Sequence, residues 1–170
     1  LFRSLNFQVY FVREGWQPVV RRIRFDGAGL AEPSRAVAEA LDQASLIVFG
    51  PSNPYLSIDP ILSIPGIRSR IARSAAPRVA VTPLIAGQAV KGPTAKLMAE
   101  MGCDVSPVEV AAHYRPLLDG FILDEADRDL LAPVEALGLR ATAQHTYMST
   151  LTDKVNLAST LLNWVEETTT

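Results

Sequence analysis

The stretch LIVFGPSNPYLSIDPIL, Leu46–Leu62, joins four consecutive apolar residues directly to a loop rich in glycine, proline and small polar residues. A short apolar run that ends at turn-forming residues is typical of a buried β-strand. The loop carries the hydroxyls of Ser52 and Ser57 and the amide of Asn53, and its prolines lower the entropy cost of holding these groups against a ligand. The alternative is a turn in which Ser52 and Asn53 bond to their own backbone.

On both sides of this stretch, short apolar strands alternate with helical segments. We expect strands at Leu46–Phe49, Arg78–Val81, Gly120–Leu123 and Leu139–Ala143. We expect helices at Pro33–Ala44, from the first loop to Arg73, and at Pro93–Met101, Val108–Tyr114, Asp127–Leu137 and Leu151–Glu167. Nearer the amino end, helical spacing favours a helix at Phe7–Phe11, and alternating apolar and basic residues favour an edge strand at Val19–Phe25.

This alternation predicts an α/β fold, an open doubly wound (Rossmann-like) and mostly parallel sheet with flanking helices. Parallel strands need long crossover connections, which the helices supply. No linker, repeat or low-complexity tract divides the chain, so we expect one α/β domain over residues 1–170. Ligands of such sheets bind beyond the carboxyl ends of the strands, which draws attention to the loops Gly50–Asn53, Thr82–Gly92 and Asp124–Asp127.

The composition is that of an ordinary globular protein, with 48% hydrophobic and 20% charged residues in 170. The net charge of −2 gives no reason to expect a nucleic acid or an anionic membrane as a partner. No apolar run approaches the length of a bilayer span, so we expect a cytoplasmic location. The only cysteine, Cys103, cannot form an internal disulfide and is expected to be a small buried apolar residue.

The loop after the second strand resembles a phosphate-binding loop only in part. Gly87, Gly92 and Thr94 have a similar spacing, but Pro93 stands where the P-loop requires lysine, so a Walker motif is excluded. A glycine followed by proline still begins a helix well, and its free N–H groups beside Lys91 would suit a phosphate. The alternative is that Gly92 is a permissive cap and Lys91 a solvated charge.

The loop after the third strand is acidic. Its residues Asp124, Glu125, Asp127 and Asp129 could supply a ligand to Mg²⁺, which takes one or two carboxylates and keeps several waters. The alternative is that these acidic residues cap the following helix. His113 and His145 have no partner pattern, and we expect packing roles for both. No Ser/His/Asp or Cys/His signature of a nucleophilic enzyme is visible.

Four long motifs together resemble the CofD family, the 2-phospho-L-lactate transferases of coenzyme F-420 biosynthesis. In chain order they read FQVYFVREGWQPVVRRIRF, GPSNPYLSIDPILSIPGIR, VAVTPLIAGQAVKGPTAKLM and HYRPLLDGFILDEAD. The resemblance runs from about Phe7 to the last helix, and it implies a Mg²⁺-dependent transfer. In that reaction the ribityl hydroxyl of the deazaflavin FO attacks the phosphate of a guanosine-diphosphate-linked three-carbon acid. GMP is released, and F-420-0 or its dehydro form is made.

The resemblance also suggests roles for single residues and for assembly. Ser52 and Asn53 would hold the reacting phosphate or the deazaflavin, Lys91 and the amides after Gly92 would neutralise charge, and Asp124 would contact metal or ribityl. Such a displacement needs positioning and charge neutralisation more than a protein nucleophile. We also expect a homodimer.

Two departures from the family pattern stand out. The family's glycine-rich amino-terminal segment, where we would expect the magnesium ligands, has no counterpart here, so we expect this chain to be the carboxy-terminal part of a longer protein. The loop that in the family usually has two glycines and a lysine reads Ala86, Gly87 and Gln88. Two alternatives remain: a non-catalytic nucleotide-sugar-binding regulator related to the gluconeogenesis factors, and an inactive segment stable only as an oligomer.

Overall fold

The computed structural model describes residues 3–169, with only the backbone of 168 and 169. Its centre is a four-stranded sheet in the order β1-β2-β5-β6, in which every neighbouring pair is parallel. The strands are β1 (Ile47–Phe49), β2 (Arg78–Val81), β5 (Gly120–Asp124) and β6 (Arg140–Gln144). The predicted α/β fold, its parallel sheet and all four of its strands are confirmed.

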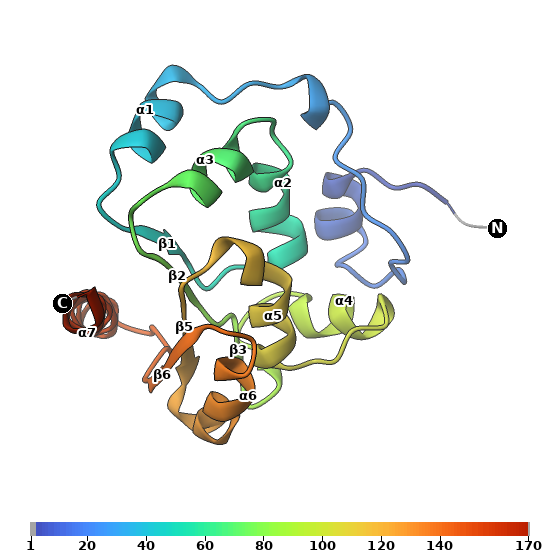
Figure 1. The fold of residues 1–170 in the computed structure, drawn as a ribbon. Helices are drawn as coiled ribbons and strands as arrows, with labels where there is room; N and C mark the ends of the chain where they lie inside the picture. Colours follow the sequence, from blue (N-terminus) through green and yellow to red (C-terminus); the bar gives the residue numbers. More distant parts are fainter. Residues whose placement is uncertain (1–2, 170) are drawn as a thin grey trace.

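Helices cover both faces of the sheet, as the doubly wound prediction requires (Figure 1). The α-helices are α1 (Arg35–Gln43), α2 (Asp59–Leu62), α3 (Ile67–Arg73), α4 (Thr94–Glu100), α5 (Pro107–Tyr114), α6 (Leu131–Glu135) and α7 (Leu151–Thr169). Short π-helical segments at Val9–Arg13 and Pro54–Ile58 and 3₁₀ segments at Ala28–Leu30, Arg115–Leu117 and Glu125–Leu130 complete the helical structure of the described residues.

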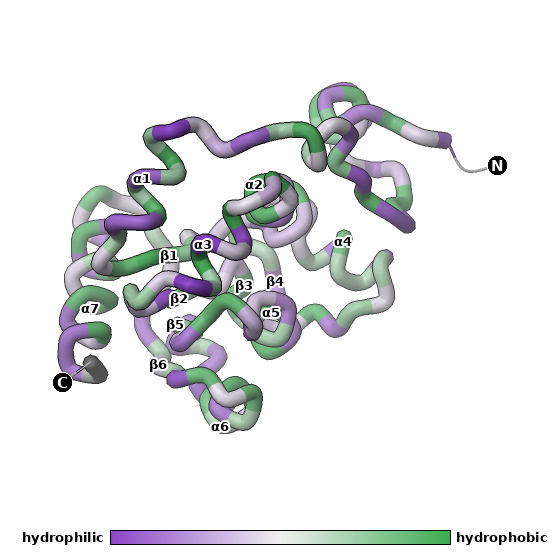
Figure 2. The backbone as a smooth tube through the Cα atoms, turned by 45° about the horizontal axis from the view of Figure 1, so that its top comes forward, coloured by the Kyte–Doolittle hydropathy of each residue, from purple (hydrophilic) through white to green (hydrophobic). Residues whose placement is uncertain are grey.

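The alternation of side chains along the strands creates two cores. Phe49, Ala80 and Phe121 point to the face covered by helices including α3, α5 and α6. Val79, Val81 and Ile122 point to the opposite face, where they meet Leu157, Leu161 and Val165 of α7. Figure 2 shows hydrophobic and hydrophilic residues alternating along α7, as expected for a helix with one buried face.

A glycine allows α7 to approach the sheet closely. A Cβ atom at Gly120 in β5 would lie 2.7 Å from the ring of Trp164 on α7. Because real Cβ contacts are longer than this, any larger residue here would displace the indole. The close approach of α7 therefore depends on Gly120.

The predicted edge strand at Val19–Phe25 is wrong. This segment has no strand pairing; instead the backbone N–H of Val20 donates to Glu100 Oε2 on α4 at 2.8 Å, and Lys96 Nζ donates to the carbonyl of Pro18 at 3.0 Å. A side chain 80 residues away therefore satisfies a group that a neighbouring strand would have bonded. The expected helix at Phe7–Phe11 is present, with π-helical geometry from Val9 to Arg13.

Three further details differ from the sequence prediction. A small hairpin of β3 (Leu84–Ile85) and β4 (Gln88–Ala89) lies where a loop was expected. The helix predicted at Asp127–Leu137 is divided into a 3₁₀ segment and the short α6, with non-helical dihedral angles at Asp127. Cys103 is half-buried and not part of the fully buried core.

None of the helices within residues 3–169 combines the length and apolar composition needed to span a bilayer.

Candidate functional site

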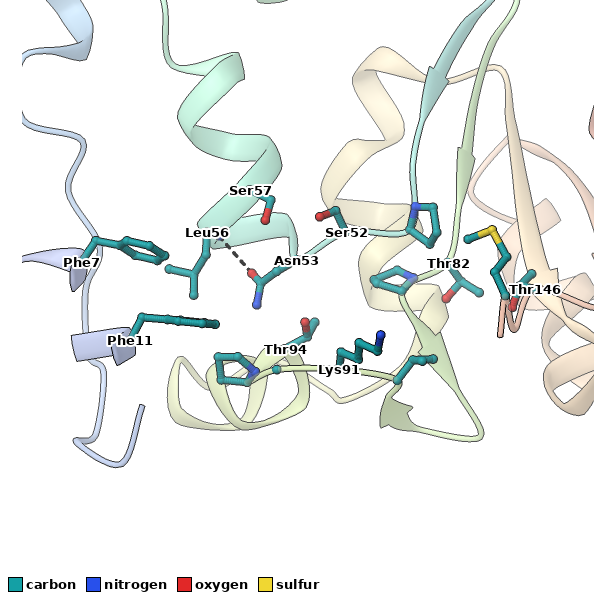
Figure 3. Close-up of a pocket in the computed structure, with 16 residues that line it drawn as sticks. Phe7, Phe11, Ser52, Asn53, Leu56, Ser57, Thr82, Lys91, Thr94 and Thr146 are labelled. Atoms are coloured by element: carbon teal, nitrogen blue, oxygen red, sulfur yellow. Dashed lines mark hydrogen bonds between the residues drawn. The ribbon is translucent and has the colours of Figure 1, made fainter. Parts of the chain in front are cut away.

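A cavity of about 410 Å³ lies at the carboxyl edge of the sheet (Figure 3). There the loops after β1, β2 and β6 meet α4 and residues 3–20, which we call the amino-terminal arm. Parallel strands bring their carboxyl ends to one edge, so residues distant in sequence converge there. The cavity is lined by Phe7, Phe11, Pro51, Ser52, Asn53, Leu56, Ser57, Thr82, Pro83, Val90, Lys91, Gly92, Pro93, Thr94, Thr146 and Met148. Its size is ordinary for a small-molecule site.

Asn53 both builds the first loop and leaves a donor at the cavity. Its Oδ1 accepts hydrogen bonds from the backbone N–H groups of Tyr55 and Leu56, both at 3.0 Å. These bonds fix the orientation of the amide, because only the oxygen can accept. Its Nδ2 is buried and has no hydrogen-bond partner. The turn-forming role and the ligand-binding role proposed for Asn53 are therefore compatible.

The second loop contributes the positive charge. Lys91 and Gly92 are exposed at the rim, and Gly92 has φ +71°, a conformation that favours glycine. Pro93 then precedes α4, whose first turn has no side-chain cap. Lys91 is the only ionisable group among the lining residues, which include no carboxylate and no histidine. The cavity is thus suited to an anion.

Asp124 lies beside this cavity, not in it. It lines a neighbouring hollow of about 380 Å³ with His145 and Tyr147. Its Oδ1 accepts from the N–H of Ala126, and its Oδ2 accepts from both the N–H and the hydroxyl of Thr146. Burial opposes ionisation, but these hydrogen bonds outweigh it and hold the pKa of Asp124 below its ordinary value. The capping role weighed for this loop is confirmed.

The residues present do not form a dedicated magnesium cage. Within residues 3–169, no group of three or more His, Cys, Asp or Glu side chains could hold a metal ion. The cavity itself offers Mg²⁺ hydroxyl and amide oxygens but no carboxylate. The described residues that line this cavity therefore supply no carboxylate ligand for Mg²⁺.

The fold brings together most of the predicted site residues. Six line the one cavity: Ser52, Asn53, Ser57, Lys91, Gly92 and Thr94. Gly87 lies outside it, in the turn of the β3–β4 hairpin with φ +69°. His113 has a packing role as expected, since it contacts Tyr55 and Tyr114 and bonds to Asp59 at 2.9 Å.

Several lining residues were missed from the sequence. Thr146 follows β6, so the same strand-end rule that identified the other loops could have found it. Phe7 and Phe11 had no such signal, because they follow no strand; the chain beyond them is bonded to α4 at Pro18 and Val20. The aromatic side of the cavity could be recognised only from the folded chain.

Comparison with known proteins agrees with this architecture. Residues 5–163 match the family described as 2-phospho-L-lactate transferase CofD. A phosphoenolpyruvate transferase from Kitasatospora aureofaciens is 37% identical over 166 residues, which are 97% of this chain and 52% of that protein. A 2-phospho-L-lactate transferase from Methanosarcina mazei is 37% identical over 154 residues, 91% of this chain and 50% of that protein.

A 2-phospho-L-lactate transferase from Methanothermobacter thermautotrophicus is 33% identical over 94% of this chain and 50% of that protein. The chain thus spans about half the length of the curated relatives it matches. The family match covers nearly all of the chain, and the chain accordingly belongs to the CofD family.

Proposed function

We propose that this chain forms part of a transferase that moves a phospholactyl-type group from a guanosine-diphosphate-linked donor to the deazaflavin FO. The group would be 2-phospholactate, phosphoenolpyruvyl or 3-phosphoglyceryl. The names of the relatives support a transfer of this kind. They do not choose the acid, because relatives named after two different acids are each 37% identical to this chain.

The observation that carries the proposal is the charge and polarity of the cavity. One lysine, several hydroxyls and one unpartnered amide N–H line it, without any carboxylate to repel a phosphate. Hydrogen bonds to a charged group are the strong ones, and Lys91 is placed to make such a bond. In this proposal Lys91, Ser52 and Thr94 hold the reacting phosphate and Asn53 orients the acceptor.

The chemistry proposed is a direct displacement between the two substrates. The terminal ribityl oxygen of FO bonds to the phosphorus of the acid's phosphate, the bond from that phosphorus to the GMP oxygen breaks, and the hydroxyl proton passes to solvent. No lining residue is a histidine, cysteine or carboxylate that could activate a protein nucleophile. Thr146 does donate to Asp124, but a carboxylate with a lowered pKa is a weak base. Positioning and charge neutralisation are therefore what the chain contributes.

Magnesium enters the proposal with the substrate. Mg²⁺ commonly binds through substrate phosphates while keeping several waters. Since the described lining residues include no carboxylate, we assign the ion no protein ligand within the cavity. FO binding should then be the same with Mg²⁺ and with a chelator.

We also propose that the chain associates as a homodimer. Val48 on the edge strand β1 is 46% exposed, and Leu30 in the amino-terminal region is 93% exposed. Exposed apolar side chains are common singly, but the edge strand that carries Val48 is a possible pairing surface for a second chain. Light scattering at several concentrations should give the mass of two chains, and a monomer at all of them would contradict this.

Turnover with a matched pair of lysine variants tests the function. Lys91→Ala should reduce the formation of GMP and F-420-0 by about 10- to 100-fold, the factor expected for one lost hydrogen bond to a charged group. Lys154→Ala removes an exposed lysine of α7 that does not line the cavity, and should leave the rate unchanged. Equal rates for all three proteins would refute the role of the cavity. Binding of a uridine diphosphate sugar without binding of FO would favour the regulator alternative.

A further inference from the structure

The segment that follows β1 has one side in the cavity and another side against α5. Four of its residues line the cavity: Ser52, Asn53, Leu56 and Ser57. Figure 3 shows this side of the segment, with Asn53 and Ser57 directed toward the loop of Lys91. Tyr55 and Asp59 do not line the cavity, and because they are four positions apart in consecutive helical turns they share the other side. Contacts of these two side chains can therefore hold the segment without occupying the cavity.

His113 on α5 contacts the segment at two points. Its Nε2 lies 2.9 Å from Asp59 Oδ1, and since an ionised carboxylate only accepts, the imidazole is the donor. The Tyr55 ring meets the imidazole nearly edge-on, with centroids 5.4 Å apart and 69° between the planes. The side chains of His113 and Asp59 are 29% and 20% exposed, so their hydrogen bond is partly shielded from water and is stronger than one at an open surface.

The hydrogen bonds that shape the segment itself are local. Asn53 accepts them through its side chain and its carbonyl, from backbone N–H groups no more than five residues further along the chain. Such bonds define a turn, but they do not fix its orientation relative to the other loops of the cavity. The bond between Asp59 and His113 joins residues 54 positions apart. It ties the turn to α5, which is itself anchored in the main core by Val110 and Ala111.

We propose that His113 is a positioning residue for the reaction. Through Asp59 and Tyr55 it holds the segment so that Asn53 and Ser57 stay directed into the cavity. This inference rests on the proposed function, in which the same segment holds the phosphate and orients the acceptor. His113 does not line the cavity and touches no substrate in this arrangement. Its effect is preorganisation, because donors that are already held in place cost less entropy on binding, and a small misplacement of a positioned group slows a reaction strongly.

Hydrogen–deuterium exchange of the free 170-residue chain tests whether the imidazole donor holds the segment. His113→Phe keeps an aromatic ring against Tyr55 but removes the donor. It should speed exchange of the N–H groups of residues 55–58 by about 3- to 10-fold, the factor for one hydrogen bond. His113→Gln keeps an N–H donor and should stay within about twofold of the parent chain. Gly120→Ala disturbs the core on the opposite face of the sheet, so it is the control for general destabilisation and should leave exchange in this segment unchanged.

Turnover separates positioning from packing. The formation of F-420-0 should fall about 3- to 10-fold in His113→Phe and return to within about twofold of the parent rate in His113→Gln. A role in packing alone predicts the reverse order, because phenylalanine fills the space of an imidazole ring better than glutamine does. Asp59→Ala removes the other partner of the bond and should slow the reaction as His113→Phe does. It takes the place of His113→Phe in both experiments if that variant does not fold.

The outcomes separate this inference from the function on which it rests. If His113→Phe matches the parent chain in exchange and turnover, or if His113→Gln restores neither, His113 packs without positioning and the transferase proposal stands. Faster exchange in the segment with unchanged turnover would also overturn the inference. If the parent chain forms no F-420-0, the transferase proposal fails, and the role of His113 in that reaction fails with it. The exchange result still decides in that case whether His113 holds the segment.

Discussion

Ala86 offers a direct test of backbone strain in the turn of the β3–β4 hairpin. It has φ +49° and is followed by Gly87 at φ +69°, the pair of positive φ angles that two-residue hairpin turns adopt. Side chains with a Cβ pay about 1–2 kcal/mol for this left-handed conformation. Because Ala86 is exposed, Ala86→Gly removes the penalty with little loss of packing.

The size of the effect follows from two opposing contributions. Glycine costs about 0.4–1 kcal/mol more than alanine in conformational entropy of the unfolded chain. The net stabilisation of Ala86→Gly should therefore be about 0.5–1 kcal/mol. The hydrogen bond from the N–H of residue 86 to Asp127 Oδ2, 2.9 Å in the parent chain, does not depend on the side chain and should persist.

Urea unfolding followed by circular dichroism measures this change. In a separate thermal unfolding experiment, the melting temperature should rise by about 1–4 °C for a chain of this length. Ala89→Gly in β4, where φ is not positive, is the matched control and should destabilise by about 0.5–1 kcal/mol. If Ala86→Gly lowers the midpoint by as much as Ala89→Gly does, the strain at Ala86 is not real.

Three further predictions concern other parts of the account. Gly120→Ala should destabilise the chain by about 1–3 kcal/mol, because the new Cβ meets the Trp164 ring, and urea unfolding should show this loss. Burial, aided by the charges of Asp124 and Asp129, raises the pKa of Asp127 despite the N–H of Ala86. The stability that protonated Asp127 contributes is therefore fully present below the pKa that this carboxyl has in the unfolded chain. That stability is lost as the pH rises through the higher pKa of the folded chain. Asp127→Asn should thus gain stability relative to the parent chain as the pH rises above the ordinary value of 3.8, and a difference that does not change with pH would contradict this. Glu100→Gln should weaken FO binding, because the charged acceptor of the Val20 N–H is lost and the segment that brings Phe7 and Phe11 to the cavity is held less firmly; FO binding equal to that of the parent chain would contradict this.

The strands and the edge of the sheet where ligands bind could be predicted from the sequence because their signals are local. Leu46–Phe49 and Gly120–Leu123 are apolar runs closed by turn or acidic residues, and the strand-end rule then placed Ser52, Asn53 and Lys91 near one another. Asn53 could be identified as either a turn-forming residue or a ligand group. Only the structure showed that its oxygen is a cap and its nitrogen is left for the cavity.

What could not be predicted depends on contacts between distant residues. Alternating residues at Val19–Phe25 favoured a strand, but the Glu100 carboxylate and the Lys96 ammonium hold this region as an irregular segment against α4. The β3–β4 hairpin was missed because its strands have only two residues each, too short for a periodic pattern. Phe7 and Phe11 were missed for a similar reason, since only the folded chain brings their segment to the cavity.

Titration of FO with the 170-residue chain in the presence of GDP tests the central claim most directly. The account predicts saturable quenching with one FO per chain, the same with Mg²⁺ and with a chelator, and no competition from a uridine diphosphate sugar. Absence of saturable FO binding, together with tight binding of the uridine sugar, would contradict the transferase account.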